Sequence, residues 1–315
     1  MAQPTNTFDT YDAVGIREDL QDVIYSIAPT DTPFMSSAAR EAVKNTLHEW
    51  QTDALAAAAT NNAVIEGDEA GLDASVATVR IGNHTQIMDK TVVITGTQEA
   101  VDKAGRASEL AYQIAKKSKE LKRDIEATLL TNQARAAGNA TTARTFASIG
   151  AWIATNDSLG TSGTSPTAAD GSDARNDGTQ RALTEDLLKT VIKGCWNSGG
   201  SPSVIMVGPF NKQKISSFTG GSTRFDASED KTLYTSIDVY SSDFGDLEVV
   251  PNRFSRDRDA LVLDMDYWSV GFLRDFTMNE LSKTGDSEKR QLLTELTLIS
   301  RSEAASGGVF DLTTA

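Results

Sequence analysis

The residues that could carry out chemistry are few, and their spacing does not suit catalysis. The chain of 315 residues has two histidines, His48 and His84, and a single cysteine, Cys195. A zinc site needs several such ligands at short spacings, so the sequence offers no Cys–His metal site. Both histidines fall in a segment that we interpret as an extended loop. We therefore expect them to be surface or interface residues rather than general bases or metal ligands.

Other catalytic and ligand-binding patterns are also incomplete. Residues 283–286 (Lys-Thr-Gly-Asp) lack the Gly-rich stretch that precedes the lysine of a phosphate-binding loop. Asp173 and Asp177 weakly resemble a calcium loop, but Arg175 and Thr184 stand where oxygen ligands are needed. No Gly-x-Ser-x-Gly nucleophile elbow occurs. We predict that the protein is not an enzyme and binds neither a cofactor nor a metal.

The composition is that of an acidic protein without a membrane span. The formal net charge is −14, 39% of the residues are hydrophobic, and the mean hydropathy is −0.31. No apolar run reaches the roughly 18 residues of a membrane-spanning helix, and we expect no signal peptide at the N-terminus. One cysteine can form no intrachain disulfide, which favours synthesis in a reducing cytoplasm. Sequence-independent DNA binding is disfavoured because it needs clustered Lys and Arg.

The elements that surround these residues are more informative, above all an extended loop over residues 47–94. Its first strand covers residues 47–53 and its return strand begins near residue 77. The tip, residues 56–74, is rich in Ala and Asn and then acidic. A loop with so few apolar residues cannot bury itself on its own domain, so we expect another chain to complete it.

A long amphipathic helix is predicted directly after this loop, from about Arg106 to Ala137. It would span roughly 45 Å at about 1.5 Å per residue. Ser108 or Gly105 could cap its start, and Gly138 is expected to end it. A coiled coil is disfavoured because the chain has no second heptad segment. The stripe expected to be buried contains Leu110, Ile114, Leu121, Ile125 and Leu129. The opposite, polar face is expected to contain Lys116, Lys117, Lys119, Lys122, Arg123 and Glu126.

The remaining segments predict an N-terminal helix, a loop and a compact α/β unit. A helix is expected within residues 10–27, and taken by itself it would open an ordinary domain. Residues 156–180 have no apolar periodicity and are predicted to form a mobile loop. From Thr184, which could cap a helix, the expected order is helix, strand, helix and three strands. These elements are predicted at residues 184–199, 204–207, 211–218, 234–240, 247–250 and 260–264.

Several short strings give this chain a family resemblance. Pro29-Thr30-Asp31-Thr32-Pro33-Phe34 and residues 46–53 (Thr-Leu-His-Glu-Trp-Gln-Thr-Asp) resemble the N-terminal region of the SU10-like major capsid proteins of tailed bacteriophages. Residues 281–290 and 295–298 resemble their C-terminal region. The extended loop that leads into a long "spine" helix is similar to the capsid fold named after phage HK97. The order and spacing of these strings extend the resemblance over nearly the whole chain.

The resemblance implies an α+β, HK97-like fold divided into five parts. The resemblance implies an N-terminal arm at residues 1–46 that reaches a neighbouring subunit, in place of a domain-opening helix, and the extended loop at residues 47–94. A peripheral domain with the spine helix would follow at 95–182, and an axial α/β domain at 183–264. Residues 265–315 would return to the peripheral domain, with strands packed under the spine helix.

The function implied is that of a major capsid protein. Subunits would form hexamers and pentamers, which assemble into an icosahedral or prolate head that encloses double-stranded DNA without sequence-specific binding. An encapsulin-type bacterial compartment shell is the alternative, and an α/β enzyme or solute-binding protein is disfavoured. The acidic charge would either repel packaged DNA or only confer solubility. The expected location is the virion, after synthesis in the host cytoplasm and without a membrane.

The expected partners follow from the same resemblance. They are other copies of the chain, a portal protein, a separately encoded scaffold protein and, in some shells, a cement protein. No lysine lies between Lys44 and Lys90, so the loop tip cannot supply a covalent link and we predict a non-covalent shell. The candidate inter-subunit contacts are Phe34, Trp50, Arg80 and His84. For Phe34 and Trp50, packing inside their own chain is the equally weighted alternative.

Overall fold

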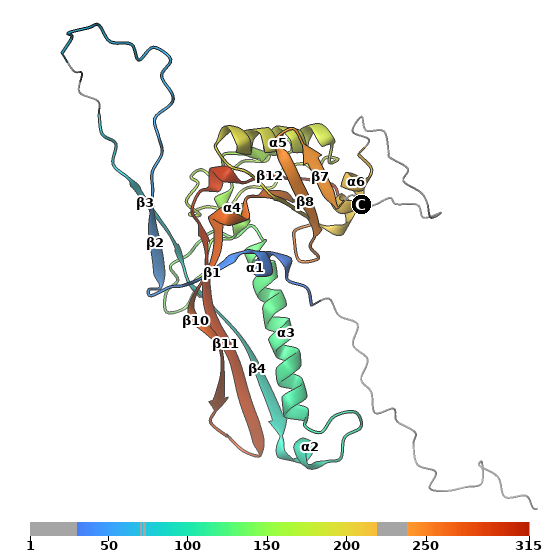
Figure 1. The fold of residues 1–315 in the computed structure, drawn as a ribbon. Helices are drawn as coiled ribbons and strands as arrows, with labels where there is room; N and C mark the ends of the chain where they lie inside the picture. The colour runs from blue at the N-terminus through green and yellow to red at the C-terminus, as the bar shows by residue number, and fades with distance from the viewer. Residues whose placement is uncertain (1–29, 70, 72–73, 219–237, 315) are drawn as a thin grey trace, which may run out of the picture.

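The structure is a computed structural model that describes residues 30–69, 71, 74–218 and 238–314. Its elements form one long helix, three sheets and several short helices (Figure 1). The helix predicted within residues 10–27 and most of the strand predicted at 234–240 lie outside the described residues. The short elements are α1 (Pro33–Ser37), α2 (Gly96–Ala100), α4 (Ile149–Trp152) and the 3-10 turns Met265–Tyr267 and Glu303–Ala305.

A four-stranded sheet and the long helix form the lower half of the molecule in Figure 1. The strand order is β1-β10-β11-β4, with β1 parallel to β10 and the other pairs antiparallel. The strands are β1 (Ala39–Ala42), β4 (Gln86–Thr95), β10 (Trp268–Leu281) and β11 (Ser287–Ser300). Helix α3 (Glu109–Leu129) lies along this sheet and buries Leu121, Ile125 and Leu129. The predicted packing of the spine helix on C-terminal strands is therefore confirmed.

The bounds of α3 differ from the prediction at its C-terminal end. Ser108 caps the helix as one of the two predicted residues, and its hydroxyl accepts the Ala111 N–H. The helix ends at Leu129, not near Ala137, so it is roughly 32 Å long at about 1.5 Å per residue. The apolar stripe also ends at Leu129, and this end of the pattern indicates the shorter helix. Gly138, with φ of 69°, belongs to a later turn.

The upper half of the molecule is built on a six-stranded sheet with the order β5-β12-β9-β6-β8-β7. Its strands are β5 (Asp157–Ser158), β6 (Val204–Val207), β7 (Val239–Ser242), β8 (Gly245–Pro251), β9 (Ala260–Leu263) and β12 (Gly307–Val309). Helices α5 (Glu185–Asn197) and α6 (Pro209–Ser216) complete it, and the Thr184 hydroxyl caps α5 as predicted. The predicted order of helices and strands is confirmed over the described residues. Strand β12, however, brings the C-terminal segment back into this sheet instead of leaving it with the four-stranded one.

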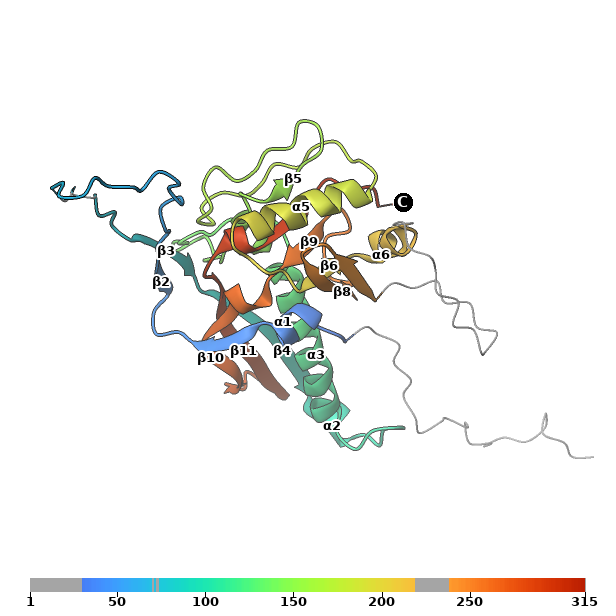
Figure 2. The same cartoon turned by 45° about the horizontal axis from the view of Figure 1, so that its top comes forward.

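The third sheet is a ribbon of β2 (Leu47–Thr52) and β3 (Val79–His84), from which the connecting loop projects away from the body (Figures 1 and 2). Residues 53–78 connect the two strands and are exposed wherever the structure describes them. Residues 86–95, which were predicted to belong to the extended loop, form β4 of the four-stranded sheet. From here on, the extended loop means residues 47–84.

The segment predicted as a mobile loop, residues 156–180, is irregular but packed. Arg175 is buried, and Thr164 and Asn176 pair as an isolated antiparallel bridge. The prediction failed because polar side chains, not apolar periodicity, hold this segment. Within the described part of the chain, no helix combines the length and apolar character needed to cross a membrane.

Candidate functional site

The base of the extended loop is packed onto the body through aromatic rings. Trp50 on β2 lies opposite Ile81 on β3, and both pack against the hydrophobic core that surrounds α3. The ring centroid of Trp50 lies 5.6 Å from that of the fully buried Trp152 and 5.7 Å from that of His48. Offset aromatic pairs at such distances stabilise by about 0.5–1.5 kcal/mol beyond the area they bury. The loop is therefore joined to the core at its root, although its far part is exposed.

A buried asparagine fixes the end of the return strand. Asn83 is 0% exposed, and its side-chain oxygen accepts the Ala147 N–H at 2.8 Å. Its amide nitrogen donates to the Ala147 carbonyl at 3.1 Å and to the Leu298 carbonyl at 2.7 Å. One side chain thus connects β3, the segment before α4 and β11. Beside it, Arg135 donates to the Gly82 carbonyl and pairs with Asp170 at 3.1 Å.

A buried carboxylate secures the corner where β3 passes into β4. Glu295 accepts the Thr85 hydroxyl at 2.8 Å and Arg274 Nε at 2.8 Å, and it also pairs with Arg144. Arg144 Nε donates in turn to the Thr85 carbonyl at 2.6 Å. Burial opposes ionisation, but the hydrogen bonds from Thr85 and Arg274 and the two arginine charges hold the pKa of Glu295 below its ordinary value. The corner is consequently ionic and fully paired.

Three of the four predicted contact residues lie on the β2–β3 ribbon. Trp50 is half-buried against the core, as described above. Arg80 is exposed and pairs with Glu49 across the ribbon at 3.2 Å. His84 is half-buried near the ionic corner, where burial and then the charges of Arg135 and Arg144 lower the pKa of its imidazole.

Phe34, the fourth predicted contact residue, lies elsewhere. It is 0% exposed and belongs to the core cluster around α3, outside the β2–β3 ribbon. Its position fits the alternative of packing inside its own chain. The ribbon therefore brings Trp50, Arg80 and His84 together and leaves Phe34 apart.

Glu126 of α3 is a functional residue that the sequence interpretation missed. It was placed on the polar face of the helix, but it is 0% exposed. Its oxygens accept the backbone N–H of Phe34 at 2.7 Å and of Met35 at 2.9 Å, and the side-chain amide of Asn252 at 2.7 Å. The first N–H groups of α1 have no intrahelical acceptor, and its N-cap Thr32 makes no side-chain bond. Glu126 therefore caps α1 from another helix.

This contact joins three parts of the chain. Glu126 lies on the spine helix, Phe34 and Met35 belong to the N-terminal segment, and Asn252 directly follows β8 of the six-stranded sheet. Burial raises the pKa of the Glu126 carboxyl, while the three donors oppose that rise. The only sequence signal was the position of Glu126 beside Ile125 on the buried stripe.

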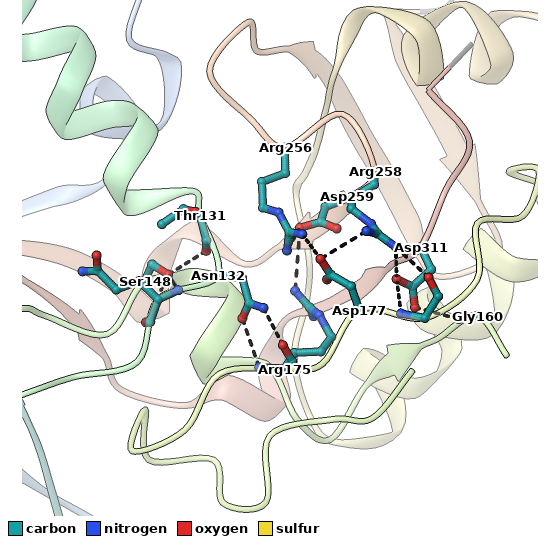
Figure 3. Close-up of polar contacts among 12 residues, drawn as sticks. Thr131, Asn132, Ser148, Gly160, Arg175, Asp177, Arg256, Arg258, Asp259 and Asp311 are labelled. Carbon is teal, nitrogen blue, oxygen red and sulfur yellow. Dashed lines mark hydrogen bonds and ion pairs between the residues drawn. The ribbon is translucent and has the colours of Figure 1, made fainter. Parts of the chain in front are cut away.

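A second polar junction lies between the 156–180 segment and the six-stranded sheet (Figure 3). Asp177 pairs with both Arg256 and Arg258, and Arg258 also pairs with Asp311 at 2.7 Å. Asp311 in turn accepts the backbone N–H groups of Gly160 at 3.0 Å and Gly178 at 2.8 Å. The C-terminal segment, the 156–180 segment and the loop before β9 are held together in this way.

Arg175 lies at the buried centre of this junction. Its guanidinium stacks on the Phe310 ring and lies 3.7 Å from Asp259, while Asn132 holds its backbone at both the N–H and the carbonyl. Burial lowers the pKa of Arg175 to about 10 and raises the pKa of Asp259 to about 6. This arginine, noted in the sequence only because it breaks a calcium pattern, is therefore a structural residue.

The contacts described above anchor distant segments to one another. Burial raises the pKa of the Cys195 thiol to about 12, which removes it as a nucleophile at neutral pH. Among the residues that the structure describes, no group of three or more His, Cys, Asp or Glu is placed to hold a metal ion. What the described side chains do is fix the root of an extended loop and join distant segments.

Comparison with known proteins decides the family. The model of the SU10 major capsid protein family matches residues 3–313, which is nearly the whole chain. The chain belongs to this family. The resemblance inferred from the short strings is confirmed, and the capsid protein is a structural component of a phage virion. That it has no catalytic activity remains a prediction.

A curated relative gives the same result over part of the chain. The major capsid protein of Escherichia phage Phieco32 is 43% identical over 135 residues, which are 43% of this chain and 38% of that protein. The chain therefore aligns with less than half the length of this relative. Neither this relative nor the matched family supports the encapsulin alternative.

Solved structures confirm the fold. That of Gordonia phage Cozz has a TM-score of 0.63 at 11% identity and covers 99% of this chain and 98% of its own. The Cyanophage A-1(L) capsid asymmetric unit has a TM-score of 0.63 at 14% identity, over 98% of this chain and 99% of its own. At such identities the likeness concerns the fold alone. The predicted α+β, HK97-like fold is correct.

Proposed function

We propose that this capsid protein assembles into hexamers and pentamers, which close into the icosahedral or prolate head of a tailed phage. The observation that carries the proposal is the extended loop. Its side chains Leu55 and Val76 are 99% and 85% exposed, and residues 53–78 are exposed wherever they are described. Apolar side chains on an extended segment are the ordinary mark of an interface completed by another chain.

The rigid root of the loop supports the same proposal. A contact at the loop tip fixes the position of the subunit only if the base of the loop is held firmly on the core. The base is held through the hydrogen bonds of Asn83, the ring contact of Trp50 and the ion pairs of Glu295. Heterologous, head-to-tail contacts of this kind close into rings, and many weak contacts together stabilise a shell in which each pair is weak. Rearrangement of the loop and of the N-terminal arm would accompany maturation.

We propose Trp50, Arg80 and His84 as contact residues in the assembled shell. The indole N–H of Trp50 is buried without an acceptor among the described residues, and a neighbouring chain could supply one. Arg80 is exposed on the ribbon and available to a neighbour. Phe34 contributes indirectly, by fixing the N-terminal segment on Glu126.

The proposed parts and partners follow the resemblance. We propose a functional division into the N-terminal arm (1–46), the extended loop (47–84), the peripheral domain (86–182 and 265–300) and the axial domain (183–264), whose sheet is joined by the C-terminal strand β12. A portal protein, a separately encoded scaffold and a cement protein are proposed partners. A solved Phage G structure contains decoration proteins, and a satellite phage P4 procapsid includes a size determination protein. Synthesis is proposed in the host cytoplasm.

The DNA is proposed to be enclosed without sequence-specific contact. A net charge of −14 repels phosphate, so packaged DNA would slide along the wall instead of sticking to it. Tight binding of duplex DNA by purified protein at low salt would contradict this.

Expression of the full chain, alone and with a candidate scaffold, tests the proposal. Negative-stain electron microscopy should show closed shells of uniform size. A monomer in every condition would refute the proposed function. Boiled shells should run as monomers on a denaturing gel because the loop tip carries no lysine between Lys44 and Lys90. A ladder of covalent multimers would refute the non-covalent shell.

A further inference from the structure

One part of the extended loop carries a concentrated negative charge. Between Lys44 and Arg80 the sequence has six acidic residues and neither Lys nor Arg. Three of these acids, Glu66, Asp68 and Glu69, gather at one turn. The Asp68 N–H donates to the Ile65 carbonyl at 3.1 Å, and Gly67 has φ of 85°, which favours glycine. We name residues 65–69 the acidic turn, and it is fully exposed.

The spine helix carries the complementary charge. Lys116, Lys119 and Lys122 are exposed and follow one another at intervals of three residues, so each is about 4.5 Å further along the helix axis. We name these three residues the lysine row. No described residue forms an ion pair with them, whereas Lys117 of the same helix is paired with Glu120 at 2.6 Å.

The two features cannot meet within one chain. The extended loop projects away from the body on one side, and α3 runs along the four-stranded sheet in the other direction (Figures 1 and 2). The root of the loop is fixed by Asn83 and Trp50, so a swing of the whole ribbon back onto α3 would break buried contacts. The complement of each feature is therefore on another copy.

We propose that the acidic turn of one subunit docks on the lysine row of a neighbouring subunit. The inference rests on the proposed function, because it requires subunits packed side by side. Lysine is well suited to this contact, since its methylene stem can cover apolar side chains while its ammonium group meets a carboxylate. Val64 and Ile65, which precede the acids, are 82% and 79% exposed and would be covered by these stems.

A nucleic acid is the less favoured partner of the lysine row. Binding to duplex DNA depends on neutralising many phosphates, and three lysines on an acidic protein supply few such contacts. The acidic turn, by contrast, presents three carboxylates in one short segment of every subunit, equal in number to the lysine row and opposite to it in charge. Opposite charges of this kind also select the register in which subunits pack.

Charge exchange tests the proposal in assembled shells. One variant carries Glu66→Lys, Asp68→Lys and Glu69→Lys, a second carries Lys116→Glu, Lys119→Glu and Lys122→Glu, and a third combines all six. Each triple variant alone should lower the yield of closed shells at least about tenfold, since residues of like charge then face each other at the contact. The combined variant should recover to within about threefold of the wild type. Arginine at the three lysine positions is the matched control and should assemble normally.

The results separate this inference from the proposed function. If the wild type forms shells, each triple variant fails to do so and the combined variant recovers, then both the capsid function and the docking contact are supported. If the wild type forms shells but the triple variants also assemble normally, the docking proposal is overturned and the capsid function is unaffected. The same holds if the combined variant assembles no better than the triple variants. Loss of DNA retention in the lysine variant without loss of shells would assign the row to nucleic acid instead.

A direct cross-link decides the point without relying on yield. A carbodiimide joins a carboxylate to an adjacent amine as an amide, with loss of water, and adds no spacer. Wild-type protein mixed from isotope-labelled and unlabelled chains should give peptides that join Glu66, Asp68 or Glu69 to the lysine row, with one label from each chain. Links confined to single chains, or no such links in shells or in concentrated protein, would overturn the proposal.

Discussion

Replacement of Glu126 tests the claim that one buried carboxylate joins the N-terminal segment, the spine helix and the six-stranded sheet. In Glu126→Ala, two backbone N–H groups and the Asn252 amide lose their acceptor. Each buried donor left unpaired costs about 1–3 kcal/mol, and removal of a buried charge offsets part of the sum. We expect a net loss of about 3–5 kcal/mol in the free energy of unfolding.

Glu126→Gln separates shape from acceptor capacity. One carboxylate oxygen accepts both Phe34 N–H and the Asn252 amide, and the other accepts only Met35 N–H. A glutamine oxygen can keep the first position, which leaves its own NH₂ group facing a donor at the second. The expected cost is about 1–2 kcal/mol, which is smaller than the cost of alanine.

Urea denaturation of unassembled subunits measures both effects. With a slope of about 3 kcal/mol per molar urea, alanine should lower the midpoint by about 1–1.7 M and glutamine by about 0.3–0.7 M. Glu120→Gln is the control, because Glu120 lies on the same helix in a partly exposed pair with Lys117 and should change stability by less than about 1 kcal/mol. An alanine variant as stable as the control would refute the reasoning.

The pH dependence of this pair of variants has a definite sign. Burial raises the pKa of Glu126 in the folded chain, so the folded state holds its proton more tightly than the unfolded state does. The contribution of Glu126 to stability is therefore greatest in acid and falls as the pH rises through the raised pKa. Because glutamine does not titrate, its cost relative to the wild type should shrink over the same range.

Three further predictions concern the root of the loop and the second junction. Asn83→Ala leaves the Ala147 N–H and the Leu298 carbonyl unpaired and should cost about 2–4 kcal/mol in urea denaturation. The pKa of Glu295 is lowered by folding, so the stability difference between wild type and Glu295→Gln should be full above the ordinary pKa and vanish as the pH falls through the lowered one. Arg175→Ala should cost about 3–5 kcal/mol, since it leaves buried Asp259 with one partner fewer.

Exposed residues of the same type provide the controls for these three. Asn62→Ala, Glu248→Gln and Arg253→Ala lie on the surface and should each stay within about 0.5 kcal/mol of the wild type. An Asn83 variant as stable as its control would disprove the stabilising role of the Asn83 hydrogen bonds. A Glu295 difference that grows on acidification would reverse the sign argued here. Equal melting of the Arg175 variant and its control would show that the junction does not hold the 156–180 segment.

The sequence by itself determined the elements whose stability is local. Helix α5 begins at its capping Thr184, and β6 covers Val204–Val207 as predicted, since capping and a short apolar run act over a few neighbouring residues. The apolar stripe of α3 likewise predicts which of its residues are buried near the C-terminal end. The exposed extended loop was also predicted from the composition of its tip. The family resemblance was carried by short sequence strings near both ends of the chain.

Only the tertiary structure decided which polar residues leave the surface. Glu126 and Arg175 have partners more than eighty residues away in sequence, and apart from the position of Glu126 beside Ile125 their local pattern does not distinguish them from solvated charges. The bounds of β4 and the return of β12 to the six-stranded sheet depend in the same way on distant strands. A buried charge is tolerated only where donors from several segments converge, and that convergence exists only after the chain has folded.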